Sequence, residues 1–299
     1  MTLRFLIAFV LLCSAAVADP PPSSVLDEGG YLAKANAAVA AYQSIREWGG
    51  TFLVKETQPD KNGKLREINT YRVHMEVMEP KWRMELSILG QKGEVVSSTT
   101  EVFDGARNWV YLIQPDEKVA SIYTHVDAPQ GSWVPSYPGT GMLMGASEIR
   151  RLVKGGLDRK GRGFSYYAGQ PKGAPKGTKA FVGLGRNGWQ GWTASFLDPG
   201  RQYVPVEIWG GYIPDPGKPK STFSSWKADG NGRLYAGEMV EEFIKPRETK
   251  VGYVYFVTTE RFTRTVDPKS VESIAFPKGT TVMLEHDPDS RYVVGEEKH

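Results

Sequence analysis

The segment DGARNWVYLIQPDEKV, residues 104–119, decides the fold class of this chain. It opens with Asp104 and Gly105, a pair typical of tight hairpin turns, and continues into five β-prone apolar residues, 109–113. Pro115 and Asp116 end that run. The segment therefore predicts a turn, a strand and a second turn. A strand this rich in aromatic side chains needs a large apolar surface beside it, which neighbouring strands must supply.

Two preceding segments, residues 71–77 and 82–88, alternate apolar and polar residues as half-buried strands do. Side chains two residues apart point to the same side of a strand, so the apolar residues of both segments should share one face of a sheet. The charged residues opposite them should face water. The apolar set is Tyr71, Val73, Met75, Val77, Trp82, Met84 and Leu86, and the charged set is Arg72, Glu76, Arg83 and Glu85.

Short connections join these segments to further candidate strands, as expected of an antiparallel meander. Helix is scarce, because only residues 32–45 show a clear helical spacing of apolar residues, and that helix is expected to cover a sheet. The chain is therefore predicted to be mainly β. The other candidate strands are residues 52–57, 95–103, 119–125, 163–168, 179–184, 192–197, 203–209, 222–227, 233–243 and 251–265.

Residues 127–145 form a long segment rich in Pro, Gly and Ser that also carries large apolar residues. A short helical pattern follows at residues 147–154. One interpretation is a lid over a ligand cavity, in which Met142, Leu143 and Met144 would cap the ligand. The other is a loop that packs permanently on the core, and the sequence does not decide between them.

The N-terminus predicts export. An apolar run follows Arg4, and Ala16-Val17-Ala18 provides the small residues of a cleavage site, so residues 1–18 are expected to be a signal peptide and 19–29 a flexible leader. Leu12 precedes the single cysteine, Cys13, where a lipoprotein site would need a small residue. Cleavage would then leave neither a disulfide nor a thiol nucleophile. The formal net charge of +3 argues against a nucleic-acid partner.

Patterns typical of catalysis are weak. Residues 183–188 match G-x-G-x-x-G but lack the βαβ setting of a nucleotide site, and no G-x-S-x-G elbow is present. The four histidines are not paired, and His286 with Asp287 and Asp289 is better explained as a solvated turn than as a metal site. We therefore expect no enzyme, no catalytic residue, no metal and no cofactor, although a catalytic carboxylate pair stays open because such pairs form in space.

The order of these features resembles the LolA/LolB family of outer-membrane lipoprotein carriers, which includes RseB-like sensor domains. The matching places are the helix at 32–45, Pro80 with Trp82, Asp104-Gly105 with Trp109 and Tyr111, the lid region at 142–154, and Phe276-Pro277 with Gly279 and Val282. The resemblance implies an open antiparallel half-barrel over residues 30–285, with an N-terminal helix and a short lid helix on its concave face. Residues 286–299 would be a C-terminal tail.

The resemblance also implies a function. It is that of a monomeric periplasmic carrier that shields the acyl chains of a lipid or an acylated protein. A membrane-associated partner is expected as well. Glu79 stands where the family often has Arg, so the expected cargo is the broader class of lipids and acyl-bearing molecules and not a lipoprotein in particular. The residues expected to line the cavity are Val73, Met75, Val77, Trp82, Met84, Leu86, Trp109, Tyr111, Met142, Leu143 and Met144.

Three alternatives stay open. The apolar side chains could form a filled core without a cavity. The protein could instead be an RseB-like envelope sensor or scaffold that docks a membrane partner. A secreted hydrolase is the third alternative.

Overall fold

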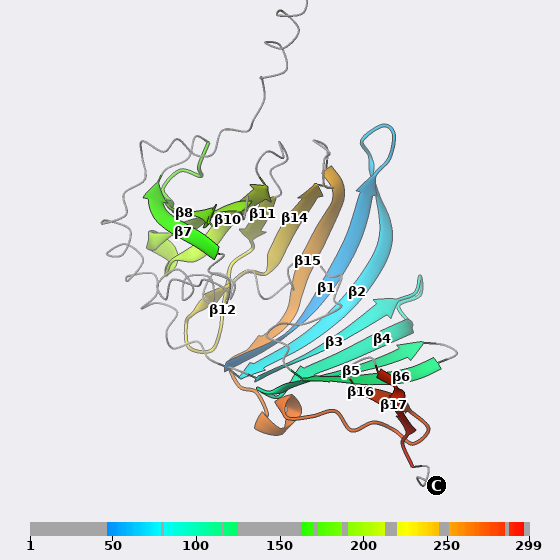
Figure 1. Cartoon of the computed structure of the whole chain (residues 1–299). Helices are drawn as coiled ribbons and strands as arrows, with labels where there is room; N and C mark the ends of the chain where they lie inside the picture. Colours follow the sequence, from blue (N-terminus) through cyan, green and yellow to red (C-terminus); the bar gives the residue numbers. More distant parts are fainter. Residues whose placement is uncertain are drawn as a thin grey trace, which may run out of the picture. The chain divides into compact units, whose positions relative to one another are not determined.

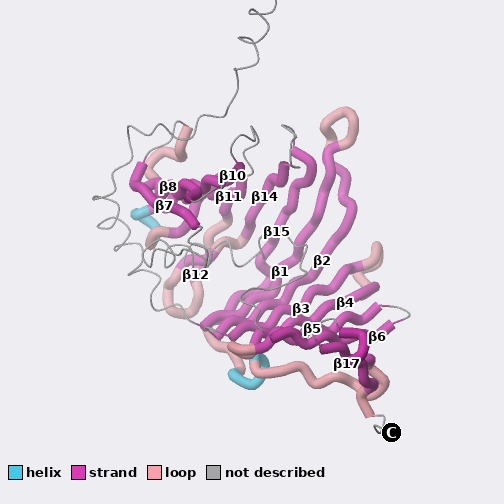
Figure 2. The backbone as a smooth tube through the Cα atoms, in the orientation of Figure 1, coloured by secondary structure: helices cyan, strands magenta, loops and turns pink. Residues whose placement is uncertain are grey.

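The computed structural model describes residues 47–78, 81–114, 117–124, 163–169, 173–186, 191–212, 220–244, 251–284 and 287–295 (Figure 1). Strands make up most of this part, and its helical segments are two short 3-10 helices, η2 and η3 (Figure 2). The strand order does not close on itself, which confirms the prediction of a mainly β chain with an open sheet. The predicted signal peptide, the helix at 32–45 and the segment at 127–154 lie outside the described residues.

The chain divides into two compact units. One comprises residues 1–41, 145–222 and 241–253, and the other comprises residues 42–144, 223–240 and 254–299. The first unit contains the strands β7 (Gly163–Gly169), β8 (Lys179–Arg186), β9 (Gly191–Asp198) and β10 (Val204–Tyr212), with η2 (Pro199–Arg201) between the last two. These strands are paired in chain order, and β10 continues to β11 (Lys220–Ser224). Phe196 and Trp209 pack together in its core, with their rings 4.4 Å apart.

The second unit holds most of the predicted meander. Its strands follow the order β17-β16-β6-β5-β4-β3-β2-β1-β15, and β16 is parallel to β6. The bounds are β1 (Glu47–Pro59), β2 (Leu65–Met78), β3 (Lys81–Leu89), β4 (Val95–Phe103), β5 (Arg107–Gln114), β6 (Glu117–Thr124), β15 (Val251–Thr263), β16 (Thr281–Leu284) and β17 (Asp287–Val293). Helix η3 (Pro268–Val271) precedes β16.

The turn at Asp104 and Gly105 forms as predicted. The Asp104 carboxylate accepts hydrogen bonds from the backbone N–H groups of Ala106 and Arg107 at 2.8 and 2.7 Å, and from the Trp109 indole at 3.2 Å. Gly105 adopts a φ of 100°, which favours glycine. These contacts fix the start of β5 and therefore its register against β4.

Two candidate strands of the second half are shorter than predicted. The strand expected at 222–227 ends at Ser224, because the next residue, Ser225, has a left-handed φ of 53°. The strand expected at 233–243 is interrupted at Gly237, where the backbone passes so close to the Ser225 carbonyl that a Cβ would lie 2.4 Å from it. A small separate sheet, β12 (Lys227–Ala228) with β13 (Leu234–Tyr235), results, and β14 (Glu238–Ile244) starts after the interruption.

Candidate functional site

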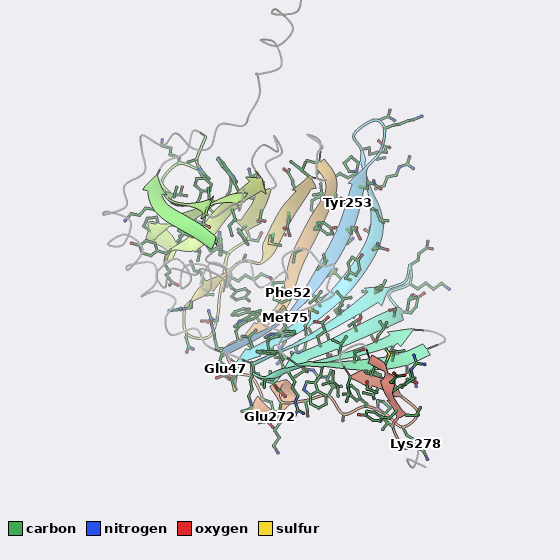
Figure 3. The ribbon with its side chains drawn as sticks, in the orientation of Figure 1. Glu47, Phe52, Met75, Tyr253, Glu272 and Lys278 are labelled. Atoms are coloured by element: carbon green, nitrogen blue, oxygen red, sulfur yellow. The ribbon has the colours of Figure 1, made fainter. Side chains whose placement is uncertain are left out.

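One face of the sheet in the second unit is apolar across β1, β2 and β3. Residues directly opposite each other on paired strands point to the same face, and Val73 pairs with Leu86, Met75 with Met84, and Val77 with Trp82. On β1, Phe52 pairs with Val73 and Trp48 with Val77. We call this side of the sheet the methionine face. On β1, β2 and β3 it carries Trp48, Phe52, Val73, Met75, Val77, Trp82, Met84 and Leu86. Phe52 and Met75 are labelled in Figure 3.

The opposite face of β2 and β3 carries the charged residues. Arg72 pairs with Ser87, and Glu76 pairs with Arg83. Arg83 also bonds Glu85 at 2.6 Å, and the side chains of Arg72 and Glu85 are 48% and 43% exposed. The prediction that the apolar and charged sets point to opposite faces is therefore confirmed.

Burial varies along the methionine face. Val73, Met75 and Met84 are buried, with exposed fractions of 0%, 3% and 1%, whereas Val77, Trp82 and Leu86 are partly buried. Aromatic pairs support its edge: Trp82 stacks on Phe103 at 6.2 Å, and Trp48 stacks on Phe262 at 6.0 Å. The structure thus brings six of the predicted lining residues together on one surface.

Trp109 and Tyr111 lie on the other side of the sheet. Val102 pairs with both Trp109 and Arg83, which places these aromatic residues on the charged face. There Phe276 contacts them, with ring centroids 6.1 Å from Trp109 and 5.7 Å from Tyr111. The cluster is completed by Val102, Ala120, Ile122, Ile274 and Val282, with Ile113, Tyr292 and Val294 packed against it.

The segment between β15 and β16, residues 264–280, explains the cluster around Trp109 and Tyr111. Glu47 accepts a hydrogen bond from the Val266 N–H at 2.6 Å, and Arg83 donates to the Ser270 carbonyl at 3.3 Å. Val271 in η3 is fully buried. Because this segment covers the opposite face beside β3, the aromatic side chains of β5 find their apolar surface there. Met142, Leu143 and Met144 lie outside the described residues.

Sequence reasoning missed Glu101. It lies on the methionine face of β4, between Met84 on β3 and Val110 on β5, and only 1% of its surface is exposed. Its Oε2 atom is buried without a hydrogen-bond partner. Burial raises the pKa of the Glu101 carboxyl to about 7. The available sequence signal was a glutamate inside the β-prone run 95–103, which had not been assigned to a face.

A second polar group lies near the end of β1 on the same face. Glu56 pairs with Tyr255 and accepts hydrogen bonds from the Tyr71 hydroxyl at 2.5 Å and from the Tyr255 hydroxyl at 3.4 Å. Burial and the neighbouring Glu56 raise the pKa of Tyr71. Unlike Glu101 Oε2, both carboxylate oxygens of Glu56 therefore accept hydrogen bonds.

Among the residues that the structure describes, no group of three or more His, Cys, Asp or Glu side chains could hold a metal ion. No helix in the same part of the chain is long and apolar enough to cross a membrane. The glycine motif at 183–188 begins within β8, which is a strand and not the strand-to-helix turn of a nucleotide site.

No protein-family model matches the chain, and no curated protein matches it either. Solved structures similar to it include a DUF1329 family protein from Desulfovibrio piger, with a TM-score of 0.48 and 10% identity over 79% of this chain and 93% of that one. A candidate outer-membrane lipoprotein-sorting protein domain from Vibrio parahaemolyticus has a TM-score of 0.47 and 11% identity, covering 79% and 93%. A LolA superfamily protein from Nitrosomonas europaea has a TM-score of 0.46 and 11% identity, covering 80% and 97%.

Proposed function

We propose that the protein is an exported periplasmic carrier that binds the acyl chains of a lipid or a lipid-modified protein on its methionine face and performs no chemistry of its own. The observation that carries the proposal is the sorting of side chains in β1, β2 and β3. Eight apolar residues share one face, and the charged residues of β2 and β3 share the other. The order of sequence motifs, which resembles lipoprotein carriers, supports the same conclusion.

The energy of burying an acyl chain on an apolar face suits this task. Burying each CH₂ group of an acyl chain contributes about 0.8 kcal/mol, so a 16-carbon chain could gain about 12 kcal/mol before the costs of ordering are subtracted. Met75 and Met84, which face each other across β2 and β3, have flexible side chains that can adapt to chains of different shape.

Mass spectrometry of organic extracts from gently purified protein tests the proposal directly. We expect acyl-bearing molecules in the extract, and we expect added fatty acids to bind more tightly as their chains lengthen. An extract without lipid, together with no binding of any chain length, would refute the carrier and favour the sensor or scaffold alternative. N-terminal sequencing of the exported protein should give Asp19.

A matched pair of variants on β3 tests the face. Leu86→Asp places a carboxylate on the methionine face, whereas Ser87→Asp places one on the opposite face. The first should lower the affinity for a fluorescent fatty-acid probe by at least about tenfold, and the second should leave it within about twofold. If Leu86→Asp lowers only the thermal stability and not the affinity, the face is a filled core.

A further inference from the structure

Glu101 lies in a row of paired residues that runs across the sheet, with an apolar residue opposite it on each neighbouring strand. Successive pairings connect Met75 to Met84, Met84 to Glu101, Glu101 to Val110, and Val110 to Ser121. The row therefore contains one ionisable group among these five positions. The diagonal neighbours of Glu101 whose side chains the structure describes are Trp82, Leu86 and Leu112, none of which can ionise.

Among the described residues of β3, β4 and β5, no basic side chain shares the face of Glu101. The basic residue closest along β3, Arg83, points to the opposite face and bonds Glu85 and the Ser270 carbonyl. Glu101 Oε2 is buried without a hydrogen-bond partner. An unpaired buried carboxyl costs free energy in the folded protein, so it calls for a partner that the described residues do not provide.

We propose that Glu101 receives the ammonium group of an amphipathic ligand whose alkyl chain lies on the methionine face. An ammonium group would donate the missing hydrogen bond and supply the missing positive charge at the same time. A fatty-acid carboxylate placed here would be repelled by ionised Glu101, and a neutral alcohol would donate a hydrogen bond without neutralising the charge. The inference rests on the proposed function, which places the alkyl chain of the ligand on the methionine face. It adds the chemical class of the ligand's polar group.

Three probes with the same chain test the inference at pH 8: dodecylamine, dodecanol and dodecanoate. Binding is measured by calorimetry on the full-length mature protein, at probe concentrations below micelle formation. The wild type should bind the amine at least about tenfold more tightly than the alcohol, and the carboxylate most weakly. Glu101→Gln keeps the shape of the side chain but removes its charge, so it should lower the amine affinity to that of the alcohol and leave the alcohol affinity unchanged.

Glu85→Gln is the matched control, because it removes a glutamate from the adjacent strand on the opposite face. It should change none of the three affinities by more than about twofold. Circular dichroism shows whether each variant is folded. Glu101→Met, an apolar replacement of similar size, shows the effect of losing the charge without placing an amide there. If Glu101→Gln binds the amine as the wild type does, the inference fails while the carrier proposal stands. If the wild type binds none of the three probes, the carrier proposal fails as well.

Discussion

Replacing Glu101 with Gln should make the stability of the protein less dependent on pH. The carboxyl has a pKa of about 7 in the folded protein, because burial disfavours its charged form, against an ordinary value of 4.5. Below pH 4.5 the carboxyl is protonated in both the folded and the unfolded chain and causes no loss of stability. Between pH 4.5 and 7 the unfolded chain ionises first, so the folded state loses stability as pH rises.

The size of this loss follows from the two pKa values. Each pH unit between them corresponds to about 1.4 kcal/mol, so the free energy of unfolding should fall by about 3 kcal/mol between pH 4 and pH 8 on account of Glu101. The Gln variant cannot ionise and should not show that loss. Its buried amide also needs hydrogen bonds, and this need changes the free energy of unfolding of the variant by an amount that does not depend on pH.

The measurement is urea unfolding of both proteins at several pH values between 4 and 8, followed by tryptophan fluorescence. The quantity of interest is the change with pH in the difference between variant and wild type, because the constant contribution of the amide then cancels. Glu85→Gln should show a much smaller change, since the Glu85 side chain is 43% exposed and solvent screens its charge. A difference between Glu101→Gln and wild type that stays constant within about 0.5 kcal/mol would refute the claim that Glu101 is buried without a partner.

Three further outcomes are expected. Asp104→Ala should lower the free energy of unfolding in urea by about 1–2 kcal/mol, because the β4–β5 turn loses three hydrogen bonds. Asp104→Asn should lower it less. Equal losses for the two variants would contradict this account. Phe276→Ala should lower the free energy of unfolding by about 3 kcal/mol. It should leave the affinity for an acyl probe within about twofold, since the Phe276 ring packs on the face opposite the methionine face. A large loss of affinity would mean that this opposite face also binds the ligand. Leu143→Asp should lower probe affinity by at least about tenfold and spare thermal stability if residues 142–144 act as a lid, whereas the reverse result would identify a fixed loop.

The alternating strands were predictable from sequence because their physical cause is local. In residues 71–77 and 82–88 every second residue is apolar, and a strand with one buried face selects that pattern directly. The Asp104 turn was predictable for the same reason, since Asp and Gly suit its hydrogen bonds and its positive φ without help from distant residues. The breaks at Ser225 and Gly237 were not predictable, because they arise where two segments approach each other closely.

The face of Trp109 and Tyr111 illustrates what local patterns leave undecided. Residues 109–113 are apolar at every position, so alternation does not indicate which side chains point to which face. The pairing with β4 decides it: Val110 joins Glu101 on the methionine face, and Trp109 joins Val102 on the opposite one. A continuous apolar run is typical of a strand that is covered on both sides, and here Phe276 from a segment more than 150 residues later supplies one cover. The same run therefore serves two surfaces, with Val110 and Leu112 on the methionine face and the aromatic residues on the opposite one. For that reason a substitution at Val110 should affect ligand binding, while one at Tyr111 should affect stability.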